Sequence, residues 1–126
     1  MTDSIATWVK EGYAAGPFDS PPCPGFRVNP ILAVVQPGKV RPVLNVSSPN
    51  GMSYNSNVDS YMAESVKMAS AKKYARNMLE CGKNCVLSKH DLVAAYKQIP
   101  CRVADLRLQG FCWLGKFFVE TRQVFG

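Results

Sequence analysis

The sequence lacks the features that define membrane and secreted proteins. No apolar run approaches the roughly 20 residues that a bilayer-spanning helix needs. The first residues, MTDSI, form neither the basic nor the apolar segment of a secretory signal. We therefore expect no membrane association and an intracellular location, in the cytoplasm or the nucleus.

Metal-ligating residues are also scarce. His90 is the single histidine, and the five cysteines contain no C-x-x-C pair. Cys81 and Cys85 lie close together in the sequence, but no second pair completes a tetrahedral zinc site. The cysteines are therefore interpreted as small buried thiols, and a zinc centre is not expected.

Charge and length indicate the class of partner. The 126 residues suit one small domain or a piece of a larger one, and the hydrophobic fraction of 47% excludes wholesale disorder. Fifteen Lys and Arg against nine Asp and Glu give a net charge of +6. This balance favours a polyanionic partner such as nucleic acid over an acidic substrate.

The order of predicted elements indicates an α+β fold. Apolar periodicity predicts helices over 2–13, 65–81 and 92–98. Apolar runs between turn residues predict strands over 31–35, 40–46, 85–88, 108–113 and 117–121. Thr2 or Asp3 is expected to cap the first helix, and Gly16-Pro17 to stop it before a proline-rich, extended and irregular stretch that runs to Pro30. The regular βαβ alternation of doubly wound folds does not occur.

Two cations follow the predicted turn at Gln36-Pro37-Gly38. Lys39 and Arg41 are two residues apart on a predicted strand, so their side chains point to the same face. Such a hairpin tip can bind a triphosphate or a nucleic-acid backbone, with Arg41 offering two parallel donors. The alternative is an edge strand that carries basic residues to prevent aggregation.

A single carboxylate, Asp91, follows the predicted strand over 85–88. A carboxylate at the end of a buried strand suits a divalent cation that also holds phosphates. The alternative is that Asp91 caps the short helix that begins at Leu92.

Both stretches resemble motifs of one enzyme family. Residues 39–47, KVRPVLNVS, are similar to the fingers motif of reverse transcriptases, and residues 89–100, KHDLVAAYKQIP, to their first palm motif. The segments GPF at 16–18, SPNG at 48–51, LQGFCW at 108–113 and FFVE at 117–120 are similar to the corresponding parts of the DIRS-type, tyrosine-recombinase retrotransposons. The chain thus resembles the fingers and partial palm of a reverse-transcriptase-like polymerase fold.

This resemblance implies RNA-directed DNA synthesis and a role for four residues. Arg41 and Lys39 would contact the triphosphate of the incoming nucleotide. Asp91 would be a catalytic residue and a ligand of the two Mg²⁺ ions. Tyr96 would lie beneath the sugar and reject a 2′-hydroxyl group.

Several departures from the family pattern bear on activity. Asn45 and Glu120 stand where the family has Asp, and Gln123-Val124 stands where it has Leu-Pro. The paired-Asp motif that supplies the remaining metal ligands would lie beyond Gly126. Two cations about 4 Å apart need several converging carboxylates, so we expect a truncated polymerase domain that is inactive alone and binds at most nucleic acid or nucleotide.

The motifs divide the chain into an N-terminal helix and proline-rich segment (1–29), a fingers-like hairpin and helix (30–84), and a partial palm (85–126). The expected partners are an RNA or DNA template–primer and either a second copy of the chain or the remaining palm and thumb of a longer protein. A competing hypothesis is a non-enzymatic interaction module or dimer, derived from a decayed retroelement, that binds another chain through exposed apolar surface.

Overall fold

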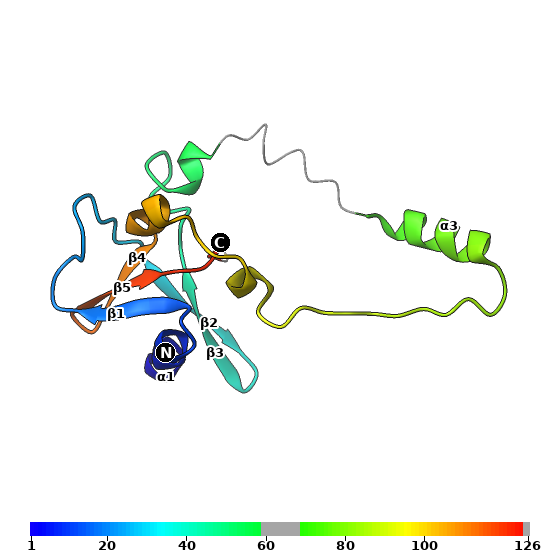
Figure 1. Cartoon of the computed structure of the whole chain (residues 1–126), viewed down its shortest axis with the longest axis horizontal. Helices are drawn as coiled ribbons and strands as arrows, with labels where there is room; N and C mark the ends of the chain where they lie inside the picture. Colours follow the sequence, from blue (N-terminus) through cyan, green and yellow to red (C-terminus); the bar gives the residue numbers. More distant parts are fainter. Residues whose placement is uncertain (59–68, 125–126) are drawn as a thin grey trace. The chain divides into compact units, whose positions relative to one another are not determined.

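The computed structural model describes residues 1–58 and 69–124 (Figure 1). The chain divides by its contacts into two compact units, of which the first joins Met1–Asn57 to Ala94–Gly126 and the second is Val58–Val93. The motif-based segments 1–29, 30–84 and 85–126 stay a prediction, since contacts do not test motif boundaries.

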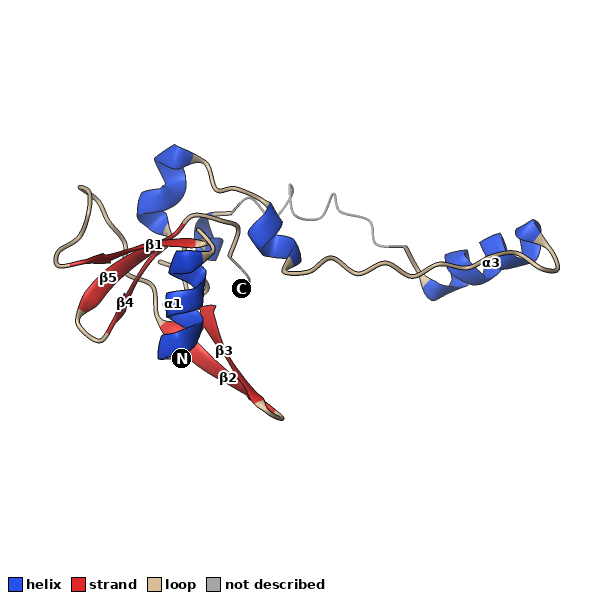
Figure 2. Ribbon diagram, turned by 60° about the horizontal axis from the view of Figure 1, so that its bottom comes forward, coloured by secondary structure: helices blue, strands red, loops and turns tan. Residues whose placement is uncertain are grey.

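The described elements are helices and antiparallel strands (Figure 2). The helices are α1 (Thr2–Lys10) and α3 (Ala71–Cys81), with 3-10 turns η1 (Asn55–Asn57), η2 (Ala95–Gln98) and η3 (Val103–Leu108). The strands are β1 (Ala14–Phe18), β2 (Ile31–Gln36), β3 (Lys39–Leu44), β4 (Gly110–Trp113) and β5 (Lys116–Glu120). The predicted α+β class is confirmed at this level.

A three-stranded sheet of order β1-β5-β4 organises the first unit. Its β4–β5 hairpin was predicted, but β1 was not, because Gly16-Pro17 was interpreted as a helix stop. Instead α1 ends at Lys10 and β1 pairs with β5. A Cβ added at Gly16 would lie 2.7 Å from the Phe118 ring and 2.8 Å from the Phe117 carbonyl oxygen, so a side chain has no room there.

The core of the first unit lies between α1, β3 and the β4–β5 hairpin. Phe111 is fully buried, stacks on Phe118 with ring centroids 5.2 Å apart, and meets the edge of Trp8 at 6.3 Å. The buried apolar cluster comprises Ile5, Leu44, Val46, Phe111, Phe118 and Val124. Helix α1 and strands β3, β4 and β5 therefore each contribute one large apolar side chain to a single core, and Val46 and Val124 join it from outside these elements.

Two local predictions in the first unit were wrong. Met1, and neither Thr2 nor Asp3, occupies the N-cap of α1, and its side chain makes no capping hydrogen bond. The Thr2 hydroxyl instead accepts a hydrogen bond from the Trp113 indole nitrogen at 3.3 Å. The helix predicted over 92–98 is only the 3-10 turn η2, which Ala94 precedes in the left-handed conformation.

In the second unit the predicted helix is present as α3, which begins after Ser70. The Ser70 hydroxyl accepts a hydrogen bond from the Lys73 amide at 3.3 Å, and Gly82 ends the helix. Residues 65–68 of the prediction lie outside the described residues. The apolar stripe of α3 is exposed: Leu79 is 82% accessible.

The strand predicted at Cys85–Ser88 is absent. Residues 85–92 have no regular secondary structure, and Val86 is 95% exposed. A four-residue apolar run becomes a strand only where another strand satisfies its backbone groups, and no described strand pairs with it. The expected packing of the long helix on this strand is therefore also wrong. So is the expectation of buried thiols, since none of the five cysteines is buried.

Candidate nucleic-acid interface

The predicted hairpin is β2–β3, and its register places the two predicted cations. Gln36 pairs with Lys39 and Val34 pairs with Arg41, with Pro37-Gly38 as the turn. Pro37 fixes its own φ and Gly38 adopts φ +70°, which is the residue order of a type II turn. This turn sets the pairing and so puts Lys39 and Arg41 on one face of β3.

Lys39 and Arg41 are exposed on that face. No ion pair links either side chain to another residue within 1–58 or 69–124. The hairpin runs outward from the rest of its unit, with the turn at the far end (Figure 2). The structure thus brings these two predicted site residues together. The ammonium group of Lys39 and the guanidinium group of Arg41 are both accessible to an anion.

The base of the hairpin is fixed by buried groups. Leu44 and Val46 are 2% and 1% exposed in the core. Asn29 is equally buried, and its side-chain amide donates to the Leu108 carbonyl at 2.8 Å and to the Gly110 carbonyl at 3.0 Å. The base of the hairpin is therefore held in the core, while the turn end, which carries Lys39 and Arg41, is exposed.

Asn45, which stands where the family has Asp, lies at the end of β3. Its side-chain oxygen accepts a hydrogen bond from the Ser47 amide at 3.1 Å. Asn55 then donates to the Ser47 hydroxyl at 2.8 Å and closes the loop that follows. An Asp carboxylate can accept the same backbone hydrogen bond, so this departure preserves the local turn.

Tyr96 lies in η2, in the first unit, and is 47% exposed. Its carbonyl oxygen accepts a hydrogen bond from the Ile99 amide at 3.2 Å, which closes the turn. The ring is therefore accessible on a short, hydrogen-bonded segment. Its predicted contact with a sugar remains a prediction.

Asp91 belongs to the second unit and is exposed. It was expected at the end of a buried strand, and this setting is wrong, because residues 85–92 form no strand. It does not cap an α-helix at Leu92 either, since the next regular element is the 3-10 turn that begins at Ala95. The described parts of the chain contain no group of three or more His, Cys, Asp or Glu that could hold a metal ion.

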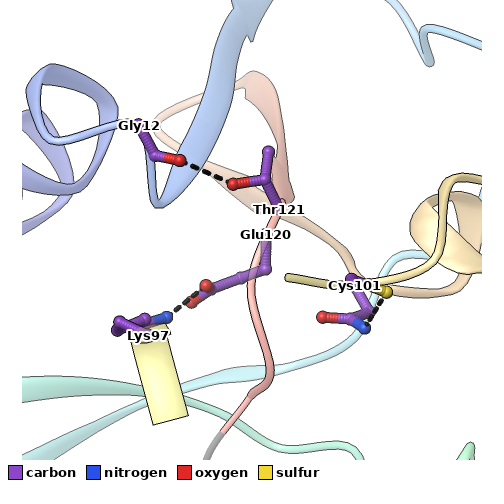
Figure 3. Close-up of polar contacts among 6 residues, drawn as sticks. Gly12, Lys97, Cys101, Glu120 and Thr121 are labelled. Carbon is purple, nitrogen blue, oxygen red and sulfur yellow. Dashed lines mark hydrogen bonds and ion pairs between the residues drawn. The ribbon is translucent and has the colours of Figure 1, made fainter. Parts of the chain in front are cut away.

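Sequence reasoning missed one buried charged group. Glu120 is 1% exposed at the end of β5, and its carboxylate forms an ion pair with the Lys97 ammonium group (Figure 3). The same ammonium group lies 4.4 Å from the centre of the Trp8 ring. Burial raises the pKa of Glu120 above its ordinary value, and Lys97 partly opposes the shift.

This ion pair joins three elements that are far apart in the sequence. Lys97 comes from η2, Glu120 from β5 and Trp8 from α1. Next to Glu120, the Thr121 hydroxyl donates to the Gly12 carbonyl at 2.6 Å (Figure 3). The burial of Glu120 was hard to predict from the sequence, because the buried residues along β5 are consecutive and do not alternate with exposed ones. The pair fixes η2, and with it Tyr96, against the sheet.

The chain matches no family model, and neither curated proteins nor solved structures gave a match. No helix in the described ranges is long and apolar enough to cross a membrane.

Proposed function

We propose that this chain is the fingers and first palm portion of a reverse-transcriptase-type polymerase of retroelement origin, and that its β2–β3 hairpin binds the phosphates of a nucleotide or a template–primer. The observation that carries the proposal is the pair Lys39 and Arg41, exposed on one face of β3 and without an ion-pair partner among the described residues. The motif similarity of residues 39–47 and 89–100 supports the assignment to this family.

The chemistry of the pair suits phosphate. Arg41 can donate two parallel hydrogen bonds to phosphate oxygens, and Lys39, two residues before it on the same face, adds a compact charge. The net charge of +6 favours the approach of a polyanion over longer distances. The hairpin supplies affinity for a backbone or a triphosphate, and no recognition of base sequence.

Nucleotidyl transfer with Mg²⁺ belongs to this proposal only for a complete palm. Asp91 would then be one metal ligand and Tyr96 would lie beneath the sugar. A two-metal centre needs several converging carboxylates. After Asp91 the only acidic residues in the sequence are Asp105 and Glu120, and the Glu120 carboxylate is buried in an ion pair with Lys97. We accordingly propose binding, and no catalytic step, for these 126 residues.

The test is the salt dependence of binding to an RNA–DNA template–primer. Replacing Lys39 and Arg41 with Ala should weaken binding and reduce the slope of log affinity against log salt by about one to two units, since each lost phosphate contact contributes about 0.9. Lys10→Ala/Arg102→Ala is the matched control, because it removes the same two charges from exposed positions outside the hairpin. An equal loss in both double variants would show that only net charge matters, and would refute the hairpin assignment.

A second candidate function is protein interaction, and a specific observation favours it. The apolar stripe of α3 is exposed, with Tyr74 at 61% and Leu79 at 82%. Amphipathic helices usually cover such a stripe with another apolar surface. Stable self-association that is indifferent to nucleic acid and is lost in Leu79→Lys would favour this function over the first.

A further inference from the structure

Among the described residues, the β2 strand has an edge that no other strand covers. Within the described parts of the chain it pairs with β3 on one side, and no strand lies on the other. The Asn45 amide donates to the Pro30 carbonyl at 2.7 Å, which fixes the alternation of the ladder. The backbone N–H and C=O groups of Leu32 and Val34 therefore form hydrogen bonds with β3. Those of Ile31, Ala33 and Val35 point away from β3, toward the open edge.

The two edges of this hairpin differ in their protection against pairing. The outer edge of β3 includes Pro42, which has no amide hydrogen, and the strand carries Lys39 and Arg41. Both features block the addition of a further strand. The β2 strand reads ILAVVQ, with no charge and no proline. Leu32, Val34 and Val35 are exposed, at 47%, 41% and 76%, whereas Ile31 is half-buried against the core.

We propose that the open edge of β2 is a self-association site, at which β2 of a second copy pairs antiparallel about a two-fold axis at Ala33. The four strands would then form one continuous sheet. Self-association at β2 does not depend on phosphate binding, because Lys39 and Arg41 lie on the other strand of the hairpin.

The strand is self-complementary in this register. Outward-facing Ala33 meets Ala33 of the partner subunit, and Ile31 meets Val35 of the partner subunit. Leu32 then lies opposite Val34 of the partner subunit in a non-hydrogen-bonded pair, where side chains are closest. Each apolar side chain from Ile31 to Val35 thus lies opposite an apolar side chain of the second copy. This match favours a second copy over an unrelated strand with polar residues at these positions.

Charge does not oppose the pairing. Lys39 and Arg41 lie on the outer strands of the four, and strands are about 4.8 Å apart. The two cationic strands would therefore be separated by about 14 Å, beyond the Debye length of about 8 Å at physiological salt. A single six-residue edge buries less than the roughly 1,000 Å² of a stable interface, so the dimer should be weak and dependent on concentration.

The experiment is sedimentation equilibrium of the full chain between about 10 μM and 1 mM, the range of weak complexes. We expect Val35→Lys to lower the association constant at least about tenfold, because it charges the edge that pairs. Val40→Lys is the matched control: Val40 is the cross-strand partner of Val35 and is also exposed, but it lies on β3. It should leave association unchanged within about twofold. Circular dichroism establishes that both variants fold.

Amide exchange of the unmodified chain gives an independent measurement. The amides of Ile31, Ala33 and Val35 should become protected as concentration rises, while that of Val40 should not. A monomer throughout the concentration range would overturn the proposal. So would association that both lysine variants weaken equally, or protection that rises at Val40 alone.

Discussion

Replacing Gly110 with Ala tests how the first unit is packed. Gly110 begins β4, pairs with Val119, and forms a parallel bridge to Val28. A Cβ added there would lie 2.2 Å from the Phe26 ring and 2.5 Å from the Arg27 carbonyl oxygen. The ring can rotate away, but the carbonyl belongs to a backbone segment that is bonded to β4.

The expected cost follows from that geometry. Overpacking costs about 1–3 kcal/mol, and Gly110→Ala should fall at the upper end because backbone must move. For a domain of 60–100 residues, about 3 kcal/mol corresponds to a fall in melting temperature of about 12–24 °C. Thermal unfolding followed by near-ultraviolet circular dichroism measures this shift through the buried aromatic residues.

Gly12→Ala is the matched control. Gly12 has φ +71° and no atom within 4 Å of an added Cβ, so alanine there is strained but not obstructed. Its expected cost is about 1–2 kcal/mol. If Gly110→Ala proves no more destabilising than Gly12→Ala, residues 26–28 do not pack closely against β4 at Gly110.

Three further predictions follow from single side chains. Phe111→Ala should destabilise the first unit by about 3–5 kcal/mol in chemical unfolding, because the ring is fully buried between Phe118 and Trp8. The pKa of Glu120 is raised in the folded chain, so the folded state binds the Glu120 proton more tightly than the unfolded state does. The stabilisation that this proton provides is complete below the ordinary pKa of 4.5 and declines as pH rises through the folded pKa. The free energy of unfolding of Glu120→Gln, relative to that of the unmodified chain, should therefore be higher at pH 7 than at pH 4. A lower relative value at pH 7 would mean that the ion pair with Lys97 outweighs the cost of burial. Asp91→Asn should leave Mn²⁺ broadening of nearby resonances unchanged, because one exposed carboxylate offers too few oxygens, and saturable broadening lost in the variant would contradict this.

Local chemistry was sufficient to predict both hairpins. At β2–β3, Pro37-Gly38 supplies the turn, so the register follows from the turn itself, and the strands on either side are rich in valine. The β4–β5 hairpin has Leu114-Gly115 at its turn, both with positive φ. The placement of Lys39 and Arg41 on one face followed directly from strand geometry.

Elements that depend on distant pairing were not predictable. Gly16-Pro17 looks like a helix stop, and only the pairing of β1 with β5 makes it part of a strand. The Cys85–Ser88 run has the composition of a strand but no described strand to pair with. The Lys97–Glu120 pair joins residues whose local patterns give no sign of burial. In each case the deciding partner lies elsewhere in the chain.

The most direct test of the central claim is chemical-shift mapping of the chain with an RNA–DNA template–primer at low salt. Binding through the β2–β3 hairpin predicts that the largest shifts fall on residues 36–41, with the Arg41 side-chain resonance among them. The shifts should vanish in Lys39→Ala/Arg41→Ala. If the largest shifts instead cluster on the basic residues of α3 (Lys72, Lys73 and Arg76) while residues 36–41 stay unchanged, the hairpin is not the phosphate-binding surface.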